Sequence, residues 1–175
     1  RGCIPTKALW GSALTIQRFK DLESHGIKTQ GTMTFDFSVA VKRQFQIMDQ
    51  MVGNIQHRMQ KLGIVTIKGF ASIAKYNAND NINRFHLNIS EHGKDSPTQV
   101  FSKFVLLATG SRPIESDVLK ADHKRVVNTD DMVLIETLPK KLAIAGGGVV
   151  ACEFASIYNK FGVQVYMLEH SSQVL

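Results

Sequence analysis

The chain has 175 residues, of which 43% are hydrophobic, enough to bury the core of one domain or parts of two. Its formal net charge of +6 comes from scattered basic residues, without the interleaved aromatic side chains of a nucleic-acid-binding stripe. No apolar run approaches the roughly 20 residues of a membrane-spanning helix. The two cysteines, 149 positions apart, do not resemble a secretory disulfide framework. We therefore expect no nucleic-acid or membrane partner, and a reducing compartment: the cytoplasm, or a mitochondrial or plastid matrix.

The first predicted element is a helix over residues 3–20 that begins at a cysteine. Leu9 and Ile16 belong to apolar positions that recur every three to four residues, as on one face of a helix. The positive end of the helix and Lys7, one turn further on, both favour the thiolate form of Cys3. The pattern predicts a reactive sulfur; an ordinary buried cysteine is the alternative.

A second, longer helix is predicted to start at a cap formed by Asp36 or Ser38 and to stop at Gly63. Its apolar stripe is rich in methionine, and we expect this stripe to pack in the core, because methionine fills irregular gaps between side chains.

After the second helix the hydrophobic period changes to that of strands. Strands are predicted over residues 64–71 and 85–89, with turn residues at 77–81 between them. Residues 101–107 are apolar almost without interruption, as in a strand buried on both faces of a parallel sheet. The pattern indicates a small antiparallel insert that returns to a buried strand. Residues 137–140 indicate a linker before a new domain.

The last part of the chain predicts a strand, a helix and a strand over residues 142–145, 149–161 and 163–168. The turn after the first of these strands fits the dinucleotide-binding pattern G-x-G-x-x-A, in Gly146, Gly147, Gly148, Val149, Val150 and Ala151. The first glycine permits the tight turn, the third lets the backbone approach a pyrophosphate, and the alanine allows close packing of helix on strand. The helix N-terminus supplies N–H donors for phosphates. A tight turn without a ligand is the alternative.

Glu169 follows the last predicted strand and stands 21 residues after Gly148. A carboxylate there can accept hydrogen bonds from ribose hydroxyls and would repel a 2′-phosphate. With no arginine cluster beside it, Glu169 predicts NAD rather than NADP. An exposed glutamate at a strand end is the alternative. Cys152, near the start of the helix, is expected to be a small packing residue.

The segment Cys3-Ile4-Pro5-Thr6-Lys7 resembles the redox-active motif of the class I flavin and pyridine-nucleotide disulfide oxidoreductases. In that motif two cysteines, five positions apart, precede an aliphatic-Pro-x-Lys run. Cys3 matches the second cysteine, so the resemblance places its partner upstream of Arg1. The resemblance also implies that Lys7 lies beside the flavin's reactive nitrogen and pairs with Glu153, in the first turn of the NAD helix.

Two further segments are similar to FAD-binding segments of this family. The run Ala108-Thr109-Gly110-Ser111 is similar to the second FAD motif, at the end of a strand where backbone can come close to a ligand. Gly69 and Ala71 match a segment whose backbone passes the adenine. The resemblance implies an α/β fold: a partial FAD-binding Rossmann-like domain with a small antiparallel meander, residues 1–115, followed by the start of an NAD-binding Rossmann domain, residues 116–175.

The implied activity is electron transfer between NAD(H), FAD and a cysteine pair, with Cys3 as the flavin-facing sulfur. Catalysis is assigned to Cys3, Lys7 and Glu153, without a metal. Thr6 stands where glutathione reductases usually carry a second lysine, so the residues favour a dihydrolipoamide dehydrogenase. Mercuric reductase, glutathione reductase, soluble transhydrogenase and a dinucleotide-binding scaffold without disulfide chemistry stay open.

The same resemblance implies a small-molecule or lipoyl-domain substrate. It also implies a homodimer formed through a C-terminal domain that lies outside these 175 residues. We therefore expect residues 1–175 alone not to turn over substrate.

Overall fold

The structure is a computed structural model that describes residues 2–175. The chain divides into two compact units, one of Arg1–Asn54 with Pro113–Leu175 and one of Ile55–Arg112, and each unit is described by itself. Within residues 2–175, every helix is too short or too polar to cross a membrane.

The first helix, α1 (Cys3–Lys20), has the predicted bounds. Its first turn is closed at Gly2, whose carbonyl oxygen accepts the Thr6 backbone N–H at 3.1 Å and the Thr6 hydroxyl at 2.7 Å. A short 3-10 helix, η1 (Leu22–His25), follows and ends at Gly26, whose φ of 75° favours glycine. The exposed cysteine therefore stands on a turn that a buried threonine braces.

The second helix, α2 (Phe37–Lys61), begins at the predicted cap. The Asp36 carboxylate accepts the backbone N–H groups of Ser38 at 2.9 Å and Val39 at 3.4 Å, so it satisfies donors that have no partner inside the helix. The Ser38 hydroxyl also donates to this carboxylate, and these hydrogen bonds lower the pKa of Asp36.

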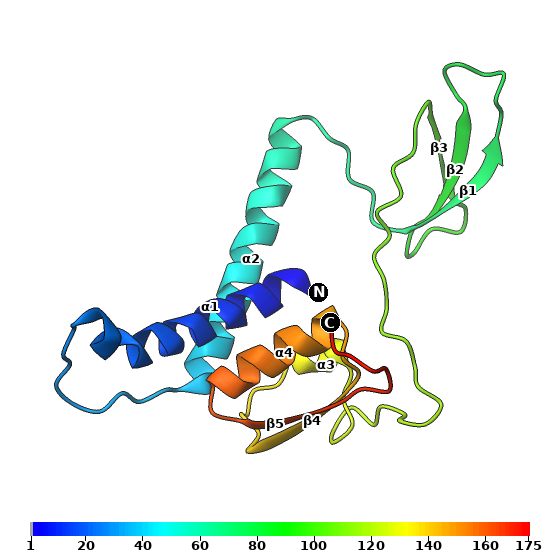
Figure 1. Ribbon diagram of the computed structural model, residues 1–175. Coiled ribbons are helices and arrows are strands. Elements are labelled where there is room, and N and C mark those ends of the chain that lie inside the picture. Colours follow the sequence, from blue (N-terminus) through cyan, green and yellow to red (C-terminus); the bar gives the residue numbers. More distant parts are fainter. Residues whose placement is uncertain (1) are drawn as a thin grey trace. The chain divides into compact units, whose positions relative to one another are not determined.

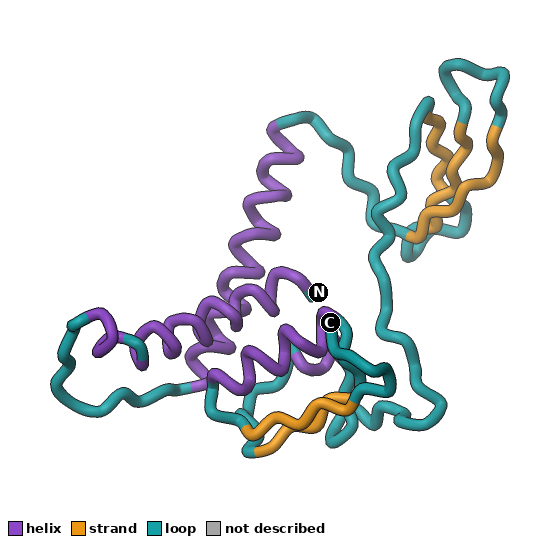
Figure 2. The backbone as a smooth tube through the Cα atoms, in the orientation of Figure 1, coloured by secondary structure: helices purple, strands orange, loops and turns teal. Residues whose placement is uncertain are grey.

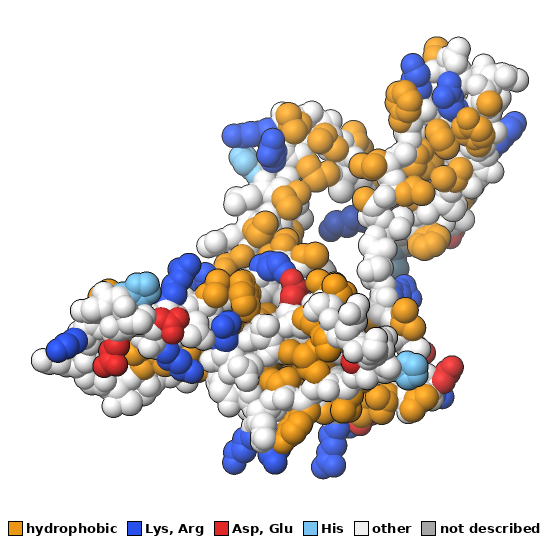
Figure 3. All heavy atoms as spheres, in the orientation of Figure 1, with side chains coloured by type: hydrophobic (Ala, Val, Ile, Leu, Met, Phe, Trp, Pro, Cys, Tyr) orange, Lys and Arg blue, Asp and Glu red, His pale blue; other side chains and the backbone are white. Residues whose placement is uncertain are grey.

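Only the first half of α2 is buried, through Phe37, Val41 and Gln44. Met51 and Val52 are 41% and 52% exposed, so the expectation that the methionine-rich stripe packs in the core is wrong for this half. Figure 3 shows hydrophobic side chains open on the surface along α2. Helical periodicity reports which side of a helix is apolar, but burial also needs an opposing surface.

The unit of residues 55–112 contains an antiparallel sheet in the order β1-β2-β3, from β1 (Phe70–Tyr76), β2 (Phe85–Ser90) and β3 (Thr98–Ser102). In the turn between β1 and β2, the Asp80 carboxylate accepts the backbone N–H groups of Ile82 and Asn83 at 2.9 and 2.7 Å. The predicted antiparallel insert is confirmed.

Two segments predicted as strands have no regular structure. Residues 64–68 precede β1 without pairing, and residues 103–112 follow β3 as a loop, which Figure 2 shows in teal. Phe104 is 75% exposed and Leu106 is 91% exposed, so the buried strand expected over 101–107 is wrong beyond Ser102. A strand forms only where another strand satisfies its backbone donors and acceptors, and none of the described strands pairs with these residues.

The β-α-β unit predicted near the end of the chain is confirmed. Strand β4 (Lys141–Ala145) pairs in parallel with β5 (Gln164–Leu168), and α4 (Val149–Lys160) connects them. Gly162, with a φ of 89°, follows the end of the helix, which the sequence predicted at residue 161.

The core of the unit of Arg1–Asn54 with Pro113–Leu175 lies where α1 packs against α4, as Figure 1 shows. It contains Leu9 and Ala13 from α1 and Ile157 and Tyr158 from α4, each no more than 1% exposed. The Phe35 ring stacks on Phe161 at a centroid distance of 4.9 Å and extends the core.

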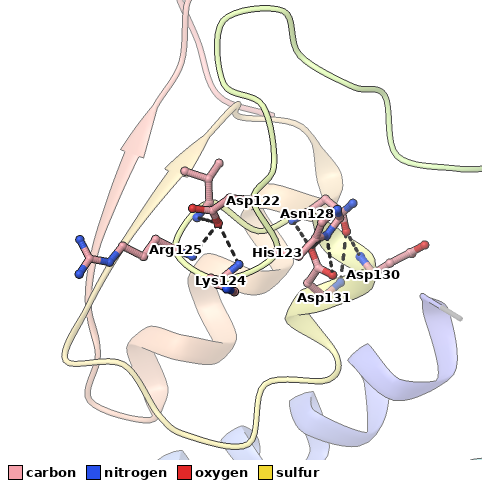
Figure 4. Close-up of polar contacts among 8 residues, drawn as sticks. Asp122, His123, Lys124, Arg125, Asn128, Asp130 and Asp131 are labelled. Atoms are coloured by element: carbon pink, nitrogen blue, oxygen red, sulfur yellow. Dashed lines mark hydrogen bonds and ion pairs between the residues drawn. The ribbon is translucent and has the colours of Figure 1, made fainter.

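The segment before β4 is held by short-range polar contacts. Asn128 and Asp131 form a reciprocal cap on α3 (Thr129–Met132), and the Asp122 carboxylate accepts the backbone N–H groups of residues 124–126 (Figure 4). His123 Nδ1 lies 2.9 Å from Asp131 Oδ2. The pKa of Asp131 is lowered, chiefly because its carboxylate accepts the Asn128 backbone N–H. The predicted domain boundary near residue 115 stays a prediction.

Candidate active site

Three predicted catalytic residues lie in the unit that contains α1 and α4. Cys3 is exposed on the first turn of α1, and Lys7 stands one turn later. The Lys7 ammonium group donates to Glu153 Oε1 on α4, across 146 positions of sequence. The ion pair implied by the family resemblance is therefore present, while its catalytic role stays a prediction.

The position of Glu153 on α4 corrects one expectation. The helix begins at Val149 and its first turn carries no acidic residue, so Glu153 belongs to the second turn. The favourable effect of a helix N-terminus on an acid falls off within the first turn. Its contact with Lys7 is therefore the stronger reason for an acid at this place.

A cavity of about 410 Å³ opens between α1 and α4 beside the ion pair. Its walls are mostly apolar, and the charges of Lys7 and Glu153 lie among them. It is lined by Thr6, Lys7, Trp10, Val149, Cys152, Glu153, Ser156, Ile157 and Leu175.

A second cavity, of about 380 Å³, lies beside Cys3. We call it the thiol groove; it is lined by Cys3, Ile4, Lys7, Ala8, Arg43, Ile47 and Met51, from α1 and α2. Lys7 lines both cavities, so the exposed thiol and the ion pair belong to one continuous region of the molecule.

The predicted dinucleotide turn has the geometry that its glycines suggest. Gly146 has a φ of 109°, which side-chain-bearing residues rarely adopt. Gly148 caps α4 in an extended conformation, and a Cβ added there would meet no atom within 4 Å. Val149, Val150 and Ala151 form the first turn of α4, whose N–H groups have no partner within the helix. Open space thus lies over a positive helix end.

Glu169 directly follows β5 and lies against the glycine turn. A Cβ added to Gly147 would stand 2.8 Å from Glu169 Oε2, so the turn and the carboxylate are in contact. The pKa of Glu169 is lowered, first by the hydrogen bond from the Ser171 backbone N–H, which measures 2.7 Å. An acceptor with a lowered pKa therefore stands beside the turn, and its role in NAD binding stays a prediction.

The residues predicted to bind the flavin nucleotide lie in the unit of residues 55–112. Gly69 precedes β1, and a Cβ added there would stand 2.6 Å from the Ser90 carbonyl oxygen, while Ala71 pairs with Ile89 in the sheet. Ala108, Thr109, Gly110 and Ser111 lie in the loop after β3. Gly110 has a φ of 76°, which accounts for a glycine there. Their role in FAD binding stays a prediction.

Both cysteines are free thiols. Cys152 is half-buried, and its sulfur lies 3.4 Å from the Gly147 carbonyl oxygen, so it packs against the glycine turn as expected of a small packing residue. Within residues 2–175, no three His, Cys, Asp or Glu side chains come together as metal ligands would.

Two lining residues were missed from the sequence. Trp10 stands three positions after Lys7, so helical periodicity could have placed it on the same side of α1. Arg43 comes from a different helix, and its Nη1 atom donates to the Ala8 carbonyl oxygen at 3.2 Å. No local pattern in the sequence marks that contact.

Comparison with known proteins identifies relatives along the whole chain. Residues 1–175 match the family model described as pyridine nucleotide-disulphide oxidoreductase. A dihydrolipoyl dehydrogenase of Bacillus subtilis (strain 168) is 33% identical over 175 residues, which are 99% of this chain and 36% of that protein. One of Chlamydia pneumoniae is 30% identical over 175 residues, covering 100% of this chain and 35% of that protein. The chain thus spans about a third of the length of these relatives.

Solved structures share the fold. LpdA from Mycobacterium tuberculosis aligns with a TM-score of 0.81 at 19% identity, over 98% of this chain and 36% of that one. The HOCl-induced flavoprotein disulfide reductase RclA from Escherichia coli aligns with a TM-score of 0.70 at 23% identity, over 99% of this chain and 34% of that one. Together with the match over all 175 residues, the cysteine-lysine helix and the glycine turn, these findings show that the chain belongs to the pyridine nucleotide-disulphide oxidoreductase family.

Proposed function

We propose that this chain is part of a flavin-dependent dihydrolipoamide dehydrogenase, which moves electrons between NAD(H), FAD and a cysteine pair that includes Cys3. The observation that carries the proposal is the ion pair between Lys7 and Glu153. It joins the helix that carries the exposed thiol to the helix that begins at the dinucleotide turn, so two motifs far apart in the sequence meet in one region.

The residues present fit a bound NAD. Gly148 leaves open space over the start of α4, and the N–H groups of the first turn can donate to a pyrophosphate. The ionised Glu169 beside Gly147 can accept hydrogen bonds from ribose hydroxyls. An ionised carboxylate at this place would repel the 2′-phosphate of NADP.

The proposed flavin site rests on the resemblance of residues 108–111 to an FAD motif and on relatives such as RclA, which is described as a flavoprotein. When bound, the flavin and nicotinamide supply the hydride and electron transfer. The protein's part is placement and charge. Lys7 holds an ammonium group beside the thiol groove, Glu153 keeps that group in position, and Cys3 offers its exposed sulfur at the start of α1.

The test follows the flavin absorbance of the full-length protein after adding NADH or dihydrolipoamide without oxygen. We expect both reductants to bleach the wild-type flavin. Cys3→Ser is expected to keep reduction by NADH and to lose reduction by dihydrolipoamide, because only the dithiol needs the cysteine pair. NADH thus serves as an internal control for folding and cofactor content.

Two results would contradict the proposal. A wild-type protein whose flavin neither reductant bleaches would be a dinucleotide-binding scaffold without disulfide chemistry. A Cys3→Ser variant that dihydrolipoamide reduces at the wild-type rate would show that Cys3 takes no part. Homodimer formation, a lipoyl-domain partner and a cytoplasmic location stay predictions from the sequence.

A further inference from the structure

The thiol groove beside Cys3 contains two cationic side chains in different electrostatic situations. Lys7 has an acidic partner, Glu153. Arg43 makes no salt bridge with any residue of the part of the chain described here. Most other groups that line the groove are apolar, among them Ile4, Ile47 and Met51. The uncompensated charge in the groove is therefore that of the guanidinium.

Arg43 is an exposed residue that lines the thiol groove, and one hydrogen bond ties its guanidinium to α1. Its Nη1 atom donates to the carbonyl oxygen of Ala8, on the helix that carries Cys3. A guanidinium has five N–H donors, so most of them stay available to another acceptor. Ala8 lies five residues after Cys3 on α1, so the carbonyl that Arg43 binds belongs to a residue roughly 7–8 Å further along the helix axis than Cys3.

We propose that Arg43 determines specificity at this site, by favouring dithiol and disulfide substrates that carry an anionic group a few bonds from the sulfur atoms. The inference rests on the proposed function, because it assumes that Cys3 exchanges electrons with such a substrate. The sulfur atoms would lie against the thiol and the apolar wall, and a carboxylate at the end of a short chain would accept hydrogen bonds from the guanidinium. Arg43 is thus assigned to binding rather than to electron transfer.

Two substitutions separate the charge of Arg43 from its hydrogen bond. Arg43→Gln removes the charge and keeps an N–H donor group, on a side chain that is two bonds shorter. Arg43→Lys keeps the charge but not the fork of donors. If a variant lost activity only because the hydrogen bond between α1 and α2 was broken, kcat/KM would fall equally for neutral and anionic substrates, and the melting temperature would fall as well.

The first assay compares dihydrolipoate with dihydrolipoamide as the dithiol for the full-length protein with NAD, since these molecules differ in one charged group. We expect Arg43→Gln to lower kcat/KM for dihydrolipoate relative to dihydrolipoamide by about two- to fivefold, the upper part of the range spanned by ion pairs of exposed side chains. The change should appear in KM rather than kcat. Arg43→Lys should keep most of the preference, and raising the salt concentration should weaken it in the wild type.

The second assay does not need the redox reaction. The reduced full-length protein is alkylated with iodoacetate or iodoacetamide, and the rate at Cys3 is followed by peptide mass spectrometry. In both reactions a carbon–sulfur bond forms as iodide leaves, and only iodoacetate carries a negative charge. Arg43→Gln should lower the iodoacetate-to-iodoacetamide rate ratio by a similar factor.

The outcomes distinguish this inference from the proposed function. If neither dithiol is oxidised, the proposed function is wrong, and the alkylation ratio still tests Arg43. If both dithiols are oxidised but Arg43→Gln changes neither ratio, the assignment of Arg43 is overturned. If Arg43→Gln and Arg43→Lys lowered the preference for the anionic substrate equally, the assignment of Arg43 would be overturned too, because charge would not be the cause.

Discussion

Replacing Glu153 by Gln removes the negative charge of the ion pair with Lys7 and keeps nearly the same size and a hydrogen-bond acceptor. The side chains of Lys7 and Glu153 are 59% and 35% exposed, so solvent screens much of their attraction. Exposed pairs of this kind contribute about 0.2–1 kcal/mol to the free energy of unfolding. We therefore expect Glu153→Gln to lower the melting temperature of the full-length protein by no more than a few degrees.

The expected effect on the reaction is much larger. If the ion pair holds positive charge beside the flavin, where electron density arrives during reduction, then Glu153→Gln leaves the Lys7 ammonium group less firmly positioned during the reaction. Removing one preorganised group of this kind typically lowers a rate by about 10²–10³. We expect such a fall in the rate of flavin reduction by NADH, measured by stopped-flow absorbance in the full-length protein.

A double-mutant cycle with Lys7→Met isolates the pair. For stability, the coupling between the two substitutions should stay within about 1 kcal/mol. For flavin reduction, the double variant should be little slower than the worse single variant, because the two groups act as one unit. A variant that unfolds far more easily but reduces its flavin at the wild-type rate would refute this reasoning and make the pair a structural contact only.

Three further predictions concern the folding of the same unit. Tyr158 is fully buried, which raises the pKa of its hydroxyl to about 12. As the pH rises, this hydroxyl therefore ionises in the unfolded chain before it ionises in the folded one. About 2–3 kcal/mol of the free energy of unfolding, present below pH 10, should be lost between pH 10 and 12. Tyr158→Phe should remove that part of the pH dependence in alkaline denaturation curves; an unchanged curve would contradict it. Gly146→Ala should lower the melting temperature, because its φ is 109°, whereas Gly148→Ala, where a Cβ meets no atom, should keep the melting temperature and weaken NAD binding measured by calorimetry. Equal melting temperatures for the two glycine variants would count against this assignment. Leu9→Ala should lower the free energy of unfolding by about 2–5 kcal/mol, because Leu9 is 1% exposed. Thr15→Ala, on the exposed side of α1, should lower it by less than about 0.5 kcal/mol. Similar losses for the two variants in urea denaturation would show that α1 does not pack as described.

Sequence patterns predicted most of the helices correctly and the strands less well. The predicted bounds of α1 agree with the structure, and the Asp36 cap starts α2, because helix ends depend on hydrogen bonds within a few residues. The strand expected over residues 101–107 forms only as β3 (Thr98–Ser102). Beyond Ser102, the apolar residues have no partner among the described strands, and no local signal reports whether a partner is present.

In the candidate site, too, local features could be predicted from the sequence and contacts between distant residues could not. The thiol at the head of α1, the left-handed glycine at 146 and the acid after β5 could be predicted from sequence, because each depends on a few neighbouring positions. The partner of Lys7 was predicted only through resemblance to a family, since spacing alone does not connect positions 7 and 153.

By itself, the sequence determined the long helices α1, α2 and α4 and the glycine turn before α4, since backbone propensity, capping and glycine geometry act over short stretches of chain. Only the tertiary structure decided which charges surround Cys3. Packing of α1 against α4 pairs Lys7 with Glu153, and the Arg43 side chain bonds to α1 without an acidic partner among the described residues. Electrostatic interactions depend on distance in space, and folding brings together residues that the sequence keeps far apart.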